Sequence, residues 1–65
     1  MPVVTLHARE GLTIEQKRGL AKDITSAVVK HLKIPPEALL IEITEYNDVN
    51  VARGGKLHVD SPPPI

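Results

Sequence analysis

Three residues of this 65-residue chain have the chemistry of a proton-transfer site: Pro2, Arg9 and Arg53. Removal of Met1 would leave Pro2 with a free secondary amine at a chain terminus. Nearby cations or an apolar pocket lower the pKa of such an amine, so that its neutral, basic form is populated near neutral pH. The amine can then move a proton at the carbon next to a carbonyl group. Proline also opens strands without any catalytic role, and the Met-Pro pair is common.

The two arginines offer planar, bidentate cations that match the geometry of a substrate carboxylate. Arg9 lies at the far end of the segment that starts with Pro2, about 20 Å away in an extended chain. The two residues can therefore share a pocket only if different subunits contribute them. Arg53 stands beside Gly54 and Gly55 in a predicted turn, a place where functional residues are often carried. A solvated surface position is nevertheless the more common role of a single arginine.

The sequence lacks other catalytic or metal-binding patterns. His7, His31 and His58 do not have the spacing of metal ligands, and the chain has no cysteine. Glu42 and Glu45 lie three apart on a predicted strand and so point to opposite faces, which argues against a carboxylate pair. The glycine pair is not followed by the residues of a phosphate-binding loop. We therefore expect no metal and no cofactor.

A strand, a helix and a second strand position these residues. Residues 2–9 carry strand formers on both faces, which indicates a strand that is covered on both sides. Thr13 and Gln16 form a capping-box pattern at the start of a helix. Apolar residues behind them recur at three- and four-residue spacing and predict about 19 helical residues. Lys17 is expected on the polar, solvent-facing side of this helix, and residues 39–45 alternate as a second strand.

A strand, a helix and a strand in this order make a βαβ unit, so the two strands should run parallel with a right-handed crossover. A turn follows at residues 46–48, and the glycine pair then permits a short hairpin between residues 49–53 and 57–59. Residues 61–65 are rich in proline and are expected to form an extended tail. The sequence thus predicts one α+β domain over residues 1–65, a single βαβ unit with a C-terminal hairpin.

Size and composition favour an oligomer. Hydrophobic residues make up 42% of the chain, and a single chain of 65 residues has little interior in which to bury them. Eight basic residues balance eight acidic ones, so no field of one sign favours nucleic acid or an anionic membrane. The apolar runs are too short to span a membrane, and the N-terminus lacks the pattern of a secretory signal. We therefore expect a cytoplasmic oligomer.

The joint pattern resembles the 4-oxalocrotonate tautomerase group of the tautomerase superfamily. The resembling residues run through nearly the whole chain up to Leu57: Met1-Pro2-Val3-Val4, Arg9-Glu10-Gly11, Glu15-Gln16-Lys17, Ile43-Thr44-Glu45 and Gly54-Gly55. The resemblance implies an isomerase in which Pro2, freed of Met1, acts as general base and then acid on an enol carboxylate, as in aromatic catabolism. It also implies that two chains share a four-stranded sheet and that three such dimers form a hexamer.

Three positions depart from the family pattern. Leu12 and Leu40 stand where the best-known members carry arginines, and Val51 stands where they carry an aromatic residue. The resemblance therefore implies substrate-binding positions at Leu12, Leu40 and Val51 that hold a dianion only weakly. The resemblance also implies that Arg9 matches an active-site arginine of dehalogenase relatives, whereas Arg53 stands at a turn position where those relatives carry a carboxylate that activates water. Together Arg9 and Arg53 could form a relocated clamp for a substrate carboxylate.

Three functions stay open at this point. The first is a homo-hexameric enol–keto tautomerase of small 2-hydroxy-dienoates or enolpyruvate-type carboxylates. The second is one subunit of a hetero-hexamer, in which a partner chain supplies the arginines that this chain lacks. The third is a weakly catalytic or non-catalytic member kept for assembly or ligand binding. The apolar substitutions also suit a less charged substrate, such as an aryl enolpyruvate.

Overall fold

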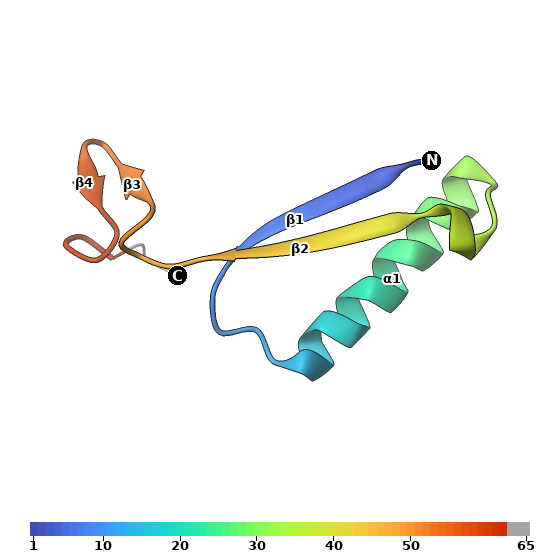
Figure 1. Ribbon diagram of the computed structural model, residues 1–65, viewed down its shortest axis with the longest axis horizontal. Coiled ribbons are helices and arrows are strands. Elements are labelled where there is room, and N and C mark those ends of the chain that lie inside the picture. The colour runs from blue at the N-terminus through green and yellow to red at the C-terminus, as the bar shows by residue number, and fades with distance from the viewer. Residues whose placement is uncertain (63–65) are drawn as a thin grey trace.

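The computed structural model describes residues 1–62 (Figure 1). Its elements in chain order are β1 (Val3–Arg9), α1 (Ile14–Leu32), the 3-10 helix η1 (Pro36–Ala38), β2 (Leu40–Tyr46), β3 (Ala52–Arg53) and β4 (Lys56–Leu57). β1 and β2 pair in parallel, with Val3 opposite Leu40 and Arg9 opposite Tyr46. The predicted βαβ unit is confirmed. Most of the predicted tail falls on residues 63–65, which lie outside the described residues.

The helix α1 is delimited by its own sequence. The Thr13 hydroxyl accepts from the Gln16 backbone N–H at 3.1 Å, and the Gln16 side chain accepts from the Thr13 N–H at 2.8 Å. At the other end Lys33 adopts a left-handed conformation, with φ of 54°, and its N–H donates to the Val29 carbonyl. Both the predicted capping box and the predicted length of 19 residues are confirmed.

The second strand begins one residue later than predicted, at Leu40 instead of residue 39. The reason is the short helix η1, which the sequence analysis missed. The Leu39 N–H donates to the Pro36 carbonyl at 3.2 Å and so closes η1 before the ladder with β1 can start.

The helix α1 lies along one face of the two-stranded sheet and leaves the other face open (Figure 1). Five apolar side chains are half-buried on the helix side: Val4, Leu6, Ala8, Ile41 and Ile43. The alternate residues are exposed on the open face: Val3, Thr5, His7, Arg9, Leu40, Glu42 and Thr44. In the single chain the first strand is therefore covered on one face only, because one helix can cover only one face. Cover on the second face, at an interface with another chain, stays a prediction.

The strands β3 and β4 form a separate hairpin that projects away from the end of the sheet (Figure 1). Ala52 pairs with Leu57 in antiparallel register. Gly54 and Gly55 make the turn with φ of +61° and +82°, left-handed values that favour glycine and match the twist of a two-residue hairpin. The predicted hairpin is thus confirmed, but with shorter strands.

The second strand of the hairpin does not reach residues 58 and 59, which corrects the prediction. The His58 N–H donates to the Val51 carbonyl at 2.9 Å, and the Val59 N–H donates to the Asp48 carbonyl at 3.2 Å. The chain turns after Leu57, where the Asp60 and Ser61 N–H groups both donate to the Leu57 carbonyl at 3.0 Å. His58 is only 6% exposed as a result.

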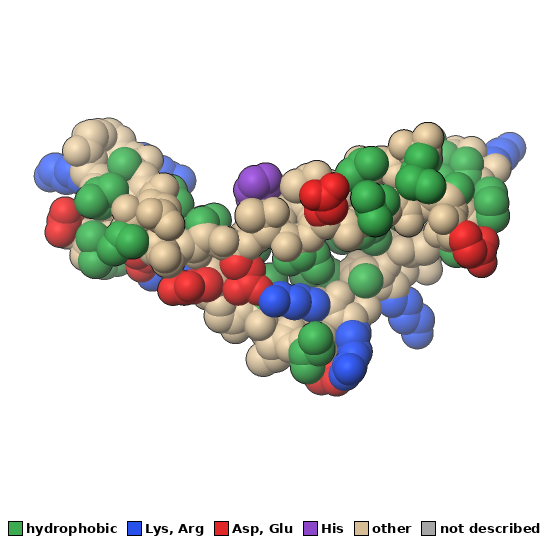
Figure 2. All heavy atoms as spheres, viewed as in Figure 1, with side chains coloured by type: hydrophobic (Ala, Val, Ile, Leu, Met, Phe, Trp, Pro, Cys, Tyr) green, Lys and Arg blue, Asp and Glu red, His purple; other side chains and the backbone are tan. Residues whose placement is uncertain are grey.

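The single chain is open in shape. Its radius of gyration is 15.1 Å, against about 11 Å for a compact domain of this length. No hydrophobic side chain among residues 1–62 is buried. Figure 2 shows hydrophobic side chains at the surface of both the βαβ unit and the hairpin. A chain with this much exposed apolar surface lacks a core of its own, as expected of a subunit.

Candidate functional site

Pro2 lies directly before β1, beside the start of β2. It is half-buried, and its carbonyl accepts from the Leu40 N–H at 3.2 Å. Val3 pairs with Leu40, and the two side chains are 52% and 47% exposed on the open face of the sheet. We call Val3 and Leu40 the apolar patch. Removal of Met1 would thus leave the Pro2 amine at the chain terminus, one residue before the apolar patch.

Arg9 lies at the other end of β1, so that within one chain it is far from Pro2, as predicted. Its guanidinium forms an ion pair with the Asp48 carboxylate in the turn that follows β2. The pair joins the end of β1 to the segment that leads into the hairpin. It uses part of the donor capacity of Arg9, since a guanidinium has five N–H groups.

Arg53 and Val51 lie close together in the sequence, at the hairpin. Arg53 is exposed in β3, directly opposite Lys56 in β4. Neither cation enters an ion pair within residues 1–62, and like charges at opposite positions repel. An anion beside Arg53 would relieve this repulsion. Val51 is half-buried just before β3, and its carbonyl is held by the His58 N–H.

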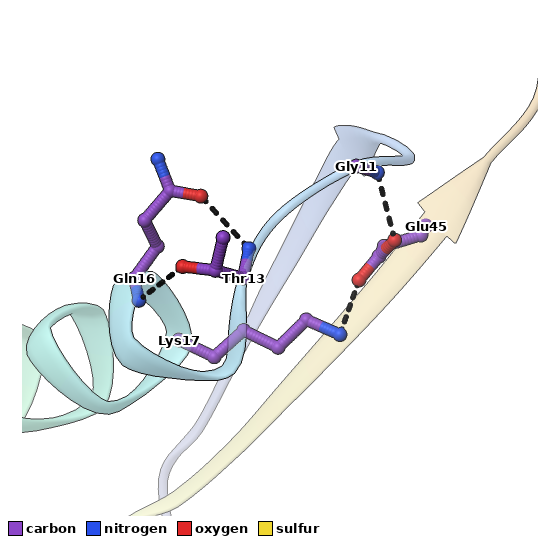
Figure 3. Close-up of polar contacts among 5 residues, drawn as sticks. All are labelled: Gly11, Thr13, Gln16, Lys17 and Glu45. Atoms are coloured by element: carbon purple, nitrogen blue, oxygen red, sulfur yellow. Dashed lines mark hydrogen bonds and ion pairs between the residues drawn. The ribbon is translucent and has the colours of Figure 1, made fainter.

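Leu12 lies in the turn between β1 and α1 and is half-buried. Gly11 before it has φ of +114° and donates its N–H to the Glu45 carboxylate at 3.3 Å (Figure 3). Thr13 after it is bound in the capping box. The backbone on both sides of Leu12 is therefore held by hydrogen bonds.

Glu45 is a functional candidate that the sequence analysis missed. One of its oxygens accepts from Gly11 and the other pairs with the Lys17 ammonium group, which reaches across from α1 (Figure 3). The hydrogen bond from Lys17 holds the pKa of Glu45 below its ordinary value. The predicted solvent-facing position of Lys17 is wrong: the residue is half-buried, because the first turn of α1 lies near the end of β2. A signal was present, since Glu45 shares the helix-facing parity of Ile43.

The candidate residues occupy three places in the single chain. Leu40 lies beside Pro2, Leu12 lies with Arg9 at the opposite end of the sheet, and Val51 and Arg53 lie in the hairpin. A pocket that contains all six would need residues from more than one chain. Over residues 1–62, no group of three His, Asp or Glu residues could hold a metal ion, and no helix is long and apolar enough to cross a membrane.

Comparison with known proteins identifies the class of protein that has this fold. A family model described as tautomerase enzyme matches residues 2–61. A protein of Bradyrhizobium diazoefficiens named probable tautomerase is 42% identical over 60 residues, which is 92% of this chain and 90% of the relative. Another protein with that name, from Bacillus cereus, is 41% identical over 56 residues, or 86% and 92% of the two chains.

Solved structures lead to the same class. YwhB, a homologue of 4-oxalocrotonate tautomerase, matches with a TM-score of 0.85 and 36% identity over 91% of this chain and 97% of its own. A 4-oxalocrotonate tautomerase isozyme of Methylibium petroleiphilum has a TM-score of 0.84 and 32% identity, covering 92% and 94%. A heterohexameric 4-oxalocrotonate tautomerase of Chloroflexus aurantiacus shares the fold, with a TM-score of 0.81 at 23% identity and coverage of 92% and 97%.

The chain therefore belongs to the tautomerase family, with the fold of 4-oxalocrotonate tautomerase. Membership supports an enzyme of the isomerase type. The predicted family resemblance and the predicted fold class are both confirmed.

Proposed function

We propose that this chain is an enol–keto tautomerase of small 2-hydroxy-dienoates or enolpyruvate-type carboxylates, with Pro2 as general base and acid once Met1 is removed. The observation that carries the proposal is the position of Pro2, half-buried directly before β1 and adjacent in the sequence to Val3 of the apolar patch. Apolar surroundings disfavour the ammonium form of an amine, so the neutral form would be available near neutral pH. A tautomerase needs a base of this kind.

The reaction needs one proton and no change of oxidation state. The neutral Pro2 nitrogen takes the proton from the enol oxygen, and the oxygen lone pair forms the carbonyl as the carbon–carbon double bond shifts. The protonated Pro2 then returns the proton to the substrate carbon that has gained electron density. Because the base of the first step is the acid of the second, the enzyme ends in its starting state.

The charges around the site favour a substrate with one carboxylate and one apolar group. Arg53 is free of ion pairs within residues 1–62, and Lys56 opposite adds a second positive charge, so the hairpin suits a carboxylate. Arg9 would add a further contact with the donors that Asp48 does not use. Leu12, Leu40 and Val51 would surround the other end of the substrate; an aryl enolpyruvate fits these requirements better than a dicarboxylate.

The active assembly that we propose is a homo-hexamer, a trimer of dimers with a four-stranded sheet in each dimer. The open sheet face and the absence of buried hydrophobic side chains from residues 1–62 support an assembly in which neighbouring chains complete the site. The second candidate is one subunit of a hetero-hexamer, as the Chloroflexus aurantiacus enzyme is named. Leu12 and Leu40 favour it, because a partner chain could supply two arginines. A cytoplasmic location and a role in aromatic catabolism stay predictions from the sequence.

The test is ketonisation of phenylenolpyruvate and of 2-hydroxymuconate, followed by absorbance, with Pro2→Ala and the matched control Pro62→Ala. Pro2→Ala replaces the secondary ring amine with a more mobile primary amine, so we expect it to lower kcat/KM by at least about tenfold, and we expect Pro62→Ala to match the parent. Equal rates for parent and Pro2→Ala on both substrates would reject the tautomerase proposal for this chain alone. Activity that appears only with a second chain would favour the hetero-hexamer.

A further inference from the structure

We infer that Glu45 is a positioning residue: its carboxylate sets the turn between β1 and α1 and thereby the place of Leu12 in the substrate pocket. The part played by Leu12 rests on the proposed function. The arrangement of the turn does not, because it comes from contacts within the single chain (Figure 3).

The turn is tied to the end of β2 at two successive residues. The Glu10 N–H donates to the Tyr46 carbonyl at 2.8 Å, and the Gly11 N–H donates to Glu45 at 3.3 Å. Leu12 is the next residue, and the capping box begins immediately after it. A shift of the Glu45 carboxylate would therefore be passed to the backbone of Leu12 over one residue.

Only a carboxylate satisfies both partners of Glu45. The Gly11 N–H and the Lys17 ammonium group are both donors, and they lie on different oxygens of the side chain. Glutamine has a single acceptor oxygen, so Glu45→Gln must turn its amide NH₂ group toward one of the two donors. This substitution keeps the size of the side chain and removes one of its two interactions, either with the Gly11 N–H or with Lys17.

Lys17 supports the same interpretation. A cation in the first turn of a helix is unfavourable because the helix dipole places positive charge there. The pair with Glu45 offsets this cost and connects α1 to β2. The two side chains are 36% and 24% exposed, whereas Arg18 and Glu15 form an ion pair within α1 and are 67% and 75% exposed. The Glu15–Arg18 pair thus provides a matched control that joins no two elements.

The first experiment uses amide hydrogen exchange at Gly11, measured on the assembled protein by NMR. In Glu45→Gln we expect the Gly11 amide to exchange at least about tenfold faster than in the parent. The Gly11 N–H either loses its acceptor or must compete with Lys17 for the one remaining acceptor oxygen. Glu15→Gln should leave Gly11 exchange unchanged. Equal Gly11 exchange in the parent and Glu45→Gln overturns the inference.

Should Glu45→Gln fail to assemble, Lys17→Met keeps the carboxylate and removes only its cation. The Gly11 amide shift should then titrate at higher pH than in the parent, because the group that lowers the pKa of Glu45 is gone. Arg18→Met should leave this titration in place. An unchanged midpoint in Lys17→Met contradicts the inference.

The second experiment asks whether Glu45 acts through Leu12, with a double-mutant cycle on phenylenolpyruvate kinetics. Glu45→Gln should raise KM by roughly tenfold and change kcat by less than about threefold, as expected for a misplaced apolar contact. In a Leu12→Ala background, Glu45→Gln should change KM by less than about twofold, since coupled residues are not additive. If the effects of Glu45→Gln and Leu12→Ala on KM are additive, Glu45 does not act through Leu12, and the inference is overturned. Failure of the proposed function would be seen separately, as equal ketonisation rates in the parent and in Pro2→Ala. Hydrogen exchange at Gly11 would still test whether Glu45 holds the turn.

Discussion

The βαβ unit and the C-terminal hairpin are stabilised in different ways. In the βαβ unit, a ladder of seven residue pairs, a helix capped by Thr13 and Gln16, and the Lys17–Glu45 pair join elements that are distant in the sequence. The hairpin has two residue pairs, two glycines with positive φ, and two further backbone bonds from His58 and Val59 to the segment just before it, so its contacts are local in the sequence. One chain is thus sufficient to define the βαβ unit, whereas the hairpin must obtain much of its support from neighbouring chains in the assembly that we propose.

This difference assigns different tasks to the two regions. The βαβ unit holds Pro2 and the turn that carries Leu12 in place, so it would supply the base and one apolar wall. The hairpin carries Val51 and Arg53 and extends away from its own sheet (Figure 1). It would therefore serve the pocket of another subunit, and substitutions in it should change binding and assembly more than local folding.

The largest effect on the hairpin side is expected from Arg53→Ala. Loss of a charge-assisted contact to a carboxylate costs about 2 kcal/mol, which corresponds to roughly a thirtyfold rise in KM. Steady-state kinetics on phenylenolpyruvate would measure it. Arg18→Ala, which removes an exposed arginine from α1, should leave KM unchanged; a similar KM in both variants would remove Arg53 from the site.

The hairpin turn itself is tested by Gly55→Ala. The φ of +82° at this position disfavours any side chain, and nothing lies within 4 Å of the new Cβ, so the cost of about 1–2 kcal/mol comes from the backbone alone. We expect weaker assembly in analytical ultracentrifugation with unchanged helix content by circular dichroism. The control Gly19→Ala, with equally open space but a helical backbone, should stabilise the chain instead. A loss of helix content in Gly55→Ala would contradict the independence of the two regions.

On the βαβ side, Thr13→Ala should cost about 1 kcal/mol, because one orphan N–H of α1 loses its acceptor. Thermal unfolding at fixed protein concentration measures this loss. Ser26→Ala, an exposed hydroxyl in the middle of the same helix, is the control. Equal unfolding temperatures for the two variants would mean that assembly contacts, and not the cap, limit the stability of the helix.

The smallest effect concerns acid. Since Lys17 holds the pKa of Glu45 below its ordinary value of 4.5, the stabilisation is present above that value and is lost as the pH falls through the folded-state pKa. Glu45→Gln should therefore be less stable than the parent at pH 7, with a difference that narrows on acidification below 4.5. Denaturant titrations at several pH values would detect this, and a difference that does not depend on pH would argue against the ion pair.

Local signals explain which parts of the structure could be predicted. The start of α1 follows from the neighbouring residues Thr13 and Gln16, and its length follows from the spacing of its apolar residues, so both were predicted correctly. The start of β2 was predicted one residue early, because the alternation of residues 39–45 does not reveal the short helix η1 that begins at Pro36. The hairpin strands were predicted too long, since the turn that the Asp60 and Ser61 N–H groups close on the Leu57 carbonyl does not appear as a periodic pattern.

The candidate site was less predictable for a physical reason. Pro2 was found because its chemistry depends on its own type and on its place at the chain end. The ion pair of Arg9 with Asp48 spans 39 residues, and the pair of Lys17 with Glu45 depends on where α1 lies over the sheet. The periodicity of apolar residues shows which face of a helix or strand is buried, but it does not show which residue of another element a side chain contacts. A pocket completed by several chains is further removed from any local pattern.

The central claim is that the free amine of Pro2 moves the proton. The same chain can be assayed with Met1 present and with Met1 removed. Protein that retains Met1 has an amide nitrogen at Pro2, which cannot act as a base. The same preparation, treated with a methionine aminopeptidase and checked by intact mass, has the free amine. We predict that ketonisation of phenylenolpyruvate rises in proportion to the fraction of chains that have lost Met1. A rate that is the same before and after removal would contradict the account.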